Sequence, residues 1–165
     1  AALDGLQRVI YVGSYSKTIA PSLRVGYIAC QRELARQIVH TKMVLTLTNS
    51  EINERLVHNV LTEGHHRRHV QTLNATLLNA QSTLNAKLTE VGLTPFTAAR
   101  GGMFSWATIE GCELSAREIA DRARQKGIWL APGDFFHLSA PHKTSFRFNV
   151  GYADVPELFD FLRGL

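Results

Sequence analysis

Residues 13–27 read GSYSKTIAPSLRVGY and continue an apolar run that begins at Val9. This run predicts a short strand over Val9–Tyr15, and a second apolar run predicts a strand over Val25–Cys30. Because both runs are almost continuously apolar, we expect a sheet that is covered on both faces. Lys17 therefore follows the end of a buried strand, which is where open α/β sheets hold their ligands.

The polar side chains of this stretch suit a small molecule that carries both an aldehyde and a phosphate. A lysine in apolar surroundings loses hydration, which favours the neutral amine, and a neutral amine forms Schiff bases with aldehydes. The hydroxyl groups of Ser14 and Ser16 can donate to an anion, and the forked guanidinium of Arg24 matches a phosphate. Pyridoxal 5′-phosphate (PLP) has both groups, so Lys17 is the candidate attachment point and the other three residues are candidate phosphate ligands.

Length and composition are those of an ordinary globular protein. The chain has 165 residues, of which 45% are hydrophobic and 19% charged, and its net charge is +4. This charge is too small and too scattered for a nucleic-acid stripe, and no apolar run is long enough to span a membrane. Cys30 and Cys112 lie outside any CxxC motif, so we expect reduced thiols in a cytoplasmic protein. The start at Ala1 has no initiator methionine and no signal peptide, so we expect a processed product or part of a longer protein.

Apolar spacing predicts three helices in the first half of the chain. Leu34–Met43 has helical spacing, and Ser50 is placed to cap the start of the next helix. The longest helix is predicted over His66–Val91, with Gly92 ending it. At 1.5 Å per residue this helix would be about 38 Å long, and a helix of that length often bridges two lobes.

Beyond residue 92, short strands and helices alternate, as in α/β or α+β proteins. Ser115 and Glu118 have the spacing of a capping box, which begins a helix that ends at Gly127. The stretch Asp154-Val155-Pro156-Glu157 is expected to cap a final helix that runs to Leu162. Strands are predicted in three stretches and a turn in a fourth: GGMFSWATI (101–109), IWLA (128–131), SFRFNV (145–150) and the turn APGDFFH (131–137).

The last of these strands presents an arginine on its polar face. Phe146, Phe148 and Val150 alternate and share one face, so Arg147 and Asn149 point the other way. An arginine between phenylalanines on a polar face suits bidentate binding of a carboxylate. The alternative is a surface arginine on an edge strand.

The pattern S-x-S-K-x-x-x-P-x-x-R-x-G-Y on a strand–turn–strand frame resembles the PLP-lysine motif of class I/II aminotransferases, which have fold type I. GGMFSW is similar to the family's small-domain strand, whose phenylalanine, here Phe104, approaches the substrate. GIWLAPGDFF is similar to the next strand and turn, and SFRFNVGYAD to the strand whose arginine, here Arg147, binds the substrate's α-carboxylate.

The resemblance implies an α/β fold, the C-terminal portion of the PLP-dependent transferase (aspartate aminotransferase-like) fold. Residues 1–65 would be the last part of the PLP-binding large domain, and residues 66–165 the bridging helix and the α+β small domain. The upstream half of the family's domain holds the aromatic residue on the pyridine ring, the aspartate at the ring nitrogen and the Asn/Tyr pair at the phenolic oxygen. None of these motifs lies in this chain, and Asp134, in a small-domain turn, is not that aspartate.

Two further stretches, EGHHRRHVQTL and LTNSEINERLVHNVL, resemble the aminotransferase-like domains of MocR-type regulators, which fuse a GntR-type winged helix to a PLP-binding domain. The resemblance implies that PLP binds through Lys17 and an amino-acid ligand through Arg147, and that DNA is bound only by a winged-helix domain absent from this chain. Thr48–Ser50 resembles the segment that reaches the partner subunit's active site, which implies a homodimer.

Two other functions stay open. A free-standing class I/II amino-acid aminotransferase would use a 2-oxo acid as its partner, and Lys17 would then move the α-proton. A degenerate, cofactor-free interaction module is the third hypothesis. His65 and His69 lie one turn apart, but no carboxylate or cysteine at ligand spacing joins them, so we expect a solvated helix start or a dimer contact rather than a metal site.

Overall fold

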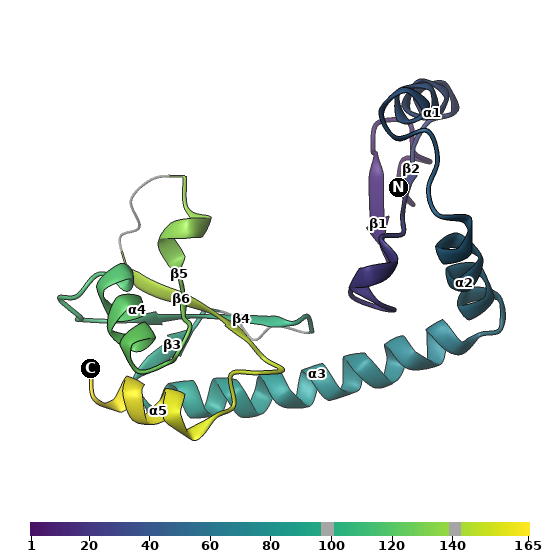
Figure 1. Cartoon of the computed structure of the whole chain (residues 1–165). Coiled ribbons are helices and arrows are strands. Elements are labelled where there is room, and N and C mark those ends of the chain that lie inside the picture. The colour runs from purple at the N-terminus through teal and green to yellow at the C-terminus, as the bar shows by residue number, and fades with distance from the viewer. Residues whose placement is uncertain (97–100, 139–142) are drawn as a thin grey trace. The chain divides into compact units, whose positions relative to one another are not determined.

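The computed structural model describes residues 1–96, 101–138 and 143–165 (Figure 1). The chain is arranged in two compact units, residues 1–71 and 72–165. The boundary falls inside the longest helix, α3 (His65–Glu90).

In the first unit, two short antiparallel strands frame the lysine segment. They are β1 (Tyr11–Ser14) and β2 (Gly26–Ala29), and Ser14 pairs with Gly26 at the end nearest the connection. A single 3₁₀ turn, η1 (Pro21–Leu23), lies between the strands. The two predicted strands are therefore confirmed, although each is shorter than the apolar run that predicted it.

The expectation of a sheet covered on both faces is not met within the described residues. Tyr11, Val12 and Ile28 are 49%, 69% and 49% exposed. Two strands present too little area to bury their own apolar side chains, and the other described residues of this unit leave these side chains exposed.

The helices of the first half begin and end close to their predicted positions. They are α1 (Arg32–Thr46), α2 (Glu51–Thr62) and α3, and the side chain of Ser50 caps α2 by accepting from the Asn53 N–H. Gly92 follows the end of α3 with a φ of +85°, a left-handed conformation that glycine adopts without strain. No helix in the described part of the chain has an apolar stretch long enough to cross a bilayer.

The second unit is built on a four-stranded antiparallel sheet in the order β3-β4-β6-β5. Its strands are β3 (Leu93–Pro95), β4 (Phe104–Ile109), β5 (Ala131–Pro132) and β6 (Thr144–Asn149). The other elements of this unit are α4 (Ala116–Gln125), the 3₁₀ turn η2 (Gly133–Phe136) and α5 (Pro156–Arg163).

The core of this unit lies between the sheet and its helices. Leu84 and Leu88 of α3, Ile119 of α4 and Phe146 of β6 are fully buried in one apolar cluster. Such packing contributes most of the stability of a small unit. The predicted capping box of α4 is confirmed, and the Ser115 side chain accepts from the Glu118 N–H while the Glu118 carboxylate accepts from the Ser115 N–H.

One local prediction for this unit is wrong. In IWLA, only Ala131 joins the sheet, because the Ile128 N–H donates to the Ala123 carbonyl at 2.9 Å and the chain is still closing α4 there. The predicted start of the final helix within residues 154–157 is confirmed, and the N-cap position of α5 is Val155. The Asp154 carboxylate pairs with Lys87 of α3. Proline at the first helical position already has the fixed φ and missing N–H that suit a helix start.

Candidate functional site

The segment between β1 and β2 forms a closed loop. The Tyr15 N–H donates to the Val25 carbonyl at 3.1 Å, which joins the two ends of the loop next to the strands. The predicted PLP ligands lie at the end of β1 and within this loop: Ser14, Ser16, Lys17 and Arg24. An amine, two hydroxyls and a guanidinium are thus carried by one short, hydrogen-bonded segment.

The hydroxyl groups and the amine of this loop remain available to a ligand. The Ser14 Oγ accepts the Ser16 N–H at 3.2 Å, so the Ser14 hydroxyl hydrogen is left to donate. Lys17 is exposed, and no described residue forms an ion pair or hydrogen bond with its ammonium group. The apolar surroundings expected of Lys17 are therefore not supplied by the described residues.

Arg24 has an unusual backbone conformation for an arginine. It follows η1 with φ +55° and ψ +36°, in the left-handed region that non-glycine residues rarely adopt. Its Nη1 donates weakly to the Pro21 carbonyl at 3.5 Å, and no carboxylate of the described residues pairs with it. Strained backbone of this kind often occurs at ligand sites, and here it carries an unneutralised guanidinium.

Tightly packed aromatic rings hold the two strands that carry the loop. Tyr27 lies across Gly13, where an added Cβ would be only 2.3 Å from the Tyr27 Cζ, so a larger residue here would displace the Tyr27 ring. The Tyr27 ring also packs on Tyr11 and Tyr15, with ring centres 5.9 and 5.5 Å apart. The interaction with Tyr11 raises the pKa of the Tyr27 phenol above its ordinary value.

Two residues of neighbouring helices contact the loop, and sequence reasoning did not assign them. Asn53 of α2 donates from Nδ2 to the Leu23 carbonyl at 3.0 Å, and the His66 Nε2 lies 3.1 Å from the Thr18 Oγ1. His66 belongs to the histidine-rich stretch weighed above as a metal site. No group of three metal-ligating side chains occurs among the described residues.

In the second unit, Arg147 lies between two aromatic rings. Its guanidinium carbon is 4.2 Å from the centre of the Phe104 ring and 4.4 Å from that of Phe136. The neighbouring Phe146 and Phe148 are buried, while Arg147 is half-buried, so the predicted division of faces is confirmed. Among the described residues no carboxylate pairs with Arg147, so its N–H groups are available to an anion.

Phe136 is a part of this site that sequence reasoning missed. It lies at the end of η2, whose first residue, Gly133, packs so closely on β6 that an added Cβ would be 2.0 Å from the Ser145 Oγ. The Phe136 ring also meets Trp106 edge-on, with ring centres 5.5 Å apart. The two phenylalanines in the predicted turn 131–137 indicated that an aromatic ring lies near this strand, but the sequence did not show which ring would contact Arg147.

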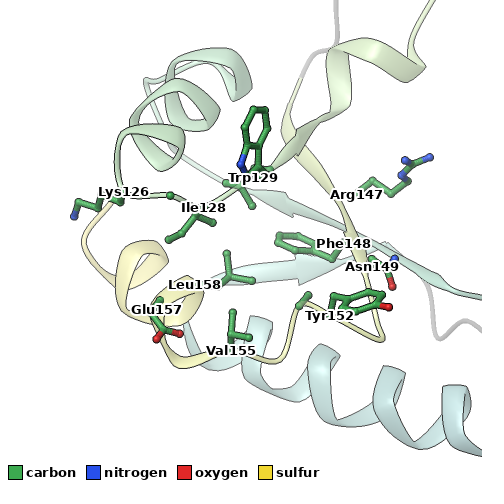
Figure 2. A pocket seen from close by; sticks show the side chains of 13 residues that line it. Lys126, Ile128, Trp129, Arg147, Phe148, Asn149, Tyr152, Val155, Glu157 and Leu158 are labelled. Carbon is green, nitrogen blue, oxygen red and sulfur yellow. The ribbon is translucent and has the colours of Figure 1, made fainter.

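A cavity of about 380 Å³ lies on the same unit, beside Arg147. Ile128, Phe148 and Leu158 are among the apolar residues that line it, and Figure 2 shows the Arg147 guanidinium at its edge, directed away from these side chains. The charge of Arg147 is therefore presented outside this cavity, toward Phe104 and Phe136.

The fold is that of a PLP-dependent aminotransferase-like protein. Residues 1–158 match the family model of aminotransferase class I and II, and the chain belongs to this family. The cofactor of this family is PLP, which agrees with the cofactor expected from the sequence.

The chain is similar both to enzymes and to regulators. It is 30% identical over 162 residues to 2-aminoadipate transaminase of Thermus thermophilus, covering 98% of this chain and 41% of the enzyme. It is 29% identical over 161 residues to the uncharacterized HTH-type transcriptional regulator YdfD of Bacillus subtilis, covering 94% of this chain and 32% of the regulator.

Solved structures confirm the aminotransferase-like fold. The multiple substrate aminotransferase of Thermococcus profundus superposes with a TM-score of 0.80 at 27% identity, covering 98% of this chain and 40% of that one. The α-aminoadipate aminotransferase LysN of Thermus thermophilus, solved with N-(5′-phosphopyridoxyl)-L-leucine, gives a TM-score of 0.81 at 26% identity. This chain spans about two fifths of the length of these proteins.

Proposed function

We propose that this chain forms part of the PLP-binding, aminotransferase-like effector domain of a MocR/GntR-type transcriptional regulator. The observation that carries the proposal is the closed loop between β1 and β2, which gathers an amine, two hydroxyls and a guanidinium with no counter-charge from the described residues. This donor set fits PLP, because the amine can attach to its aldehyde and the other groups are ordinary phosphate ligands.

The chain's own residues have distinct parts in this proposal. The Lys17 Nζ attaches to the cofactor, and Ser14, Ser16 and Arg24 bind its phosphate. Arg147 binds the carboxylate of an amino-acid ligand, and Phe104 holds the guanidinium at one side of that site. When PLP is bound, its ring supplies a sink for electrons from the α-carbon of the ligand.

The regulator assignment is supported by the similarity to YdfD and by the stretches around Thr48–Ser50 and His65–His69. An amino acid that competes with Lys17 for the cofactor would change the contacts of the loop. A winged-helix domain outside this chain would bind DNA, and the intact protein would be a cytoplasmic homodimer. The DNA response would then depend on the amino acid.

A second candidate is a free-standing amino-acid aminotransferase, which the similarity to 2-aminoadipate transaminase supports. In that case the Lys17 Nζ would accept the α-proton of the substrate and return it to the cofactor carbon. Incubation of the intact PLP-loaded protein with L-2-aminoadipate and a 2-oxo acid distinguishes the two. Catalytic release of 2-oxoadipate supports the enzyme, whereas an amino-acid-dependent change in DNA affinity without turnover supports the regulator.

The attachment residue is tested in the intact protein with Lys17→Ala. We expect this variant to lose both the visible absorbance of bound PLP and the pyridoxyl label that borohydride reduction leaves on the Lys17 peptide. Lys42→Ala removes an exposed lysine of α1 and should keep both signals. An unchanged label in Lys17→Ala would show that PLP attaches elsewhere.

A further inference from the structure

The loop that carries Lys17 and Arg24 is held from outside at two points. Asn53 of α2 donates to the Leu23 carbonyl at 3.0 Å, and His66, in the first turn of α3, lies 3.1 Å from the Thr18 hydroxyl. Both contacts are partly buried, and both join residues far apart in the sequence. The loop is thus fixed to two helices and not only to its own strands.

The Asn53 contact acts on the backbone of Arg24. The Leu23 carbonyl belongs to the peptide group that also contains the Arg24 nitrogen, so a hydrogen bond to it orients that peptide plane. The φ of +55° at Arg24 is measured from this same plane. Asn53 therefore supports the left-handed conformation that directs the arginine side chain, and the guanidinium keeps only its weak hydrogen bond to the Pro21 carbonyl, with no carboxylate partner among the described residues.

The His66 contacts lie on both sides of Lys17. The ring meets Tyr15 edge-on, with ring centres 5.8 Å apart, and its Nε2 reaches the Thr18 hydroxyl. The backbone carbonyl of Tyr15 accepts the backbone N–H of Ile19 at 2.8 Å, which closes the turn that contains Lys17. A single imidazole thus touches a residue before and a residue after the lysine without touching its amine.

We propose that His66 and Asn53 are positioning residues, with His66 fixing Lys17 for attachment and Asn53 fixing Arg24 for the phosphate. The inference rests on the proposed function, because it assigns these contacts to the two groups of PLP. A misplaced nucleophile loses rate even when it remains in the site, and a misplaced guanidinium loses its paired hydrogen bonds.

The division of roles is tested with two ligands that each lack one reacting group. Pyridoxine 5′-phosphate has an alcohol in place of the aldehyde and reports on the phosphate site alone. Pyridoxal lacks the phosphate and reports on attachment to Lys17. The intact protein is stripped of cofactor, and equilibrium binding of the first and the borohydride-trapped labelling rate of the second are measured.

Replacing His66 with alanine should slow labelling of Lys17 by pyridoxal by about tenfold, a typical effect of one lost contact. Binding of pyridoxine 5′-phosphate should change by less than about twofold. The matched control is His65→Ala, which removes the adjacent imidazole that pairs with Glu63. Labelling of His66→Ala at the rate of this control would overturn the role of His66.

Replacing Asn53 with alanine should give the opposite pattern. Binding of pyridoxine 5′-phosphate should weaken by about tenfold, while labelling by pyridoxal keeps its rate. Asn59→Ala, which shortens an exposed amide on the same helix, is the control. If Asn53→Ala and His66→Ala impair both ligands equally, the two residues support folding only and the proposal is wrong.

A conservative variant and a double-mutant cycle separate positioning from loss of folding. In His66→Gln the amide can take the place of Nε2, so labelling should recover to within about threefold of the parent. Thr18→Val should slow labelling by itself and add little to His66→Ala, because both remove the same contact. Additive effects would contradict that contact.

The parent protein distinguishes this inference from the proposed function. If the parent takes up no label at Lys17 from PLP, both proposals fail. If the parent is labelled while the His66 and Asn53 variants match their controls, only the positioning roles fail.

Discussion

The guanidinium carbon of Arg147 lies 4.2 Å from the centre of the Phe104 ring, and the Phe136 ring is 4.4 Å away from the same carbon. Cation–π contacts of this kind hold a guanidinium by its flat faces. Its N–H donors lie along the edge and remain free for a carboxylate, which binds best as a bidentate partner. The two rings therefore orient the arginine without consuming its hydrogen bonds.

Replacing Arg147 with lysine should keep the positive charge but lose the flat, forked group. We expect the affinity for the amino-acid ligand of the proposed function, with L-2-aminoadipate as the probe, to fall by about tenfold to a hundredfold, the range for a lost charge-assisted hydrogen bond. PLP labelling of Lys17 should be unchanged. Titration of the PLP-loaded intact protein, followed by absorbance, measures both, and Arg122→Lys on the exposed face of α4 is the control. Equal affinity in Arg147→Lys and the parent would exclude bidentate binding.

Arg24 allows its charge and its backbone conformation to be examined separately. Arg24→Gln removes the charge and should weaken PLP binding by at least about tenfold, with the remaining affinity less sensitive to salt. Arg24→Gly removes the charge and also relieves the left-handed strain. Its affinity for PLP should equal that of Arg24→Gln, but its unfolding temperature should be the same as that of Arg24→Gln or higher.

The control for Arg24 is Arg36→Gln, which breaks only an exposed pair with Glu33. Such pairs contribute little, so both PLP affinity and unfolding temperature should stay near those of the parent. PLP affinity lowered equally in Arg36→Gln and Arg24→Gln would mean that the effect is one of net charge.

Gly133 links the packing of the second unit to the ring that holds Arg147. A Cβ at this position would lie 2.0 Å from the Ser145 Oγ, a buried hydroxyl with no hydrogen-bond partner among the described residues. Gly133→Ala should therefore destabilise the protein by about 1–3 kcal/mol, as overpacked sites do, and should weaken amino-acid binding by displacing Phe136.

Ser145 provides the test of that mechanism. Ser145→Ala alone removes an unpaired buried hydroxyl and should be neutral or slightly stabilising. Combined with Gly133→Ala it should recover part, though not all, of the lost stability, because the Ser145 Cβ and carbonyl remain 3.2 and 3.1 Å from the new methyl group. Chemical denaturation of the four proteins measures this, and purely additive effects would rule out the clash.

Periodicity predicted much of this fold from the sequence. The apolar spacing of α3, the cap of α2 at Ser50 and the capping box of α4 depend on residues within one or two turns, so local patterns were sufficient. The face of β6 that carries Arg147 followed from simple alternation. The motif around Lys17 was recognisable because its residues lie in one continuous stretch.

Contacts between distant segments were not predictable in this way. Asn53 and His66 reach the loop across 30 and 48 residues, and neither breaks the pattern of its helix. Phe136 depends on how tightly Gly133 packs, which no periodicity records. The ion pair between Asp154 and Lys87 joins residues 67 apart, so local patterns do not show it. Local rules fail where a tertiary partner competes with a local one.

The capping box of α4 should make stability depend on pH. The Ser115 hydroxyl, followed by the Ser115 backbone N–H, lowers the pKa of Glu118 below its ordinary value of 4.5. A group whose pKa is lower in the folded protein adds stability above its unfolded pKa, and this is lost as the pH falls through the folded value. The loss of stability in Glu118→Ala should therefore be largest near neutral pH and shrink below pH 4.5.

The source of this pH dependence is examined in a Ser115→Ala background. Without the hydroxyl, the main cause of the lowered pKa is absent, so Glu118→Ala should show a weaker dependence on pH there. Thermal unfolding of the parent, both single variants and the double variant, at a series of pH values, gives the comparison. An effect of Glu118→Ala that is as pH-dependent without Ser115 as with it would place the stabilisation in other partners of the carboxylate, such as the nearby Arg122 charge.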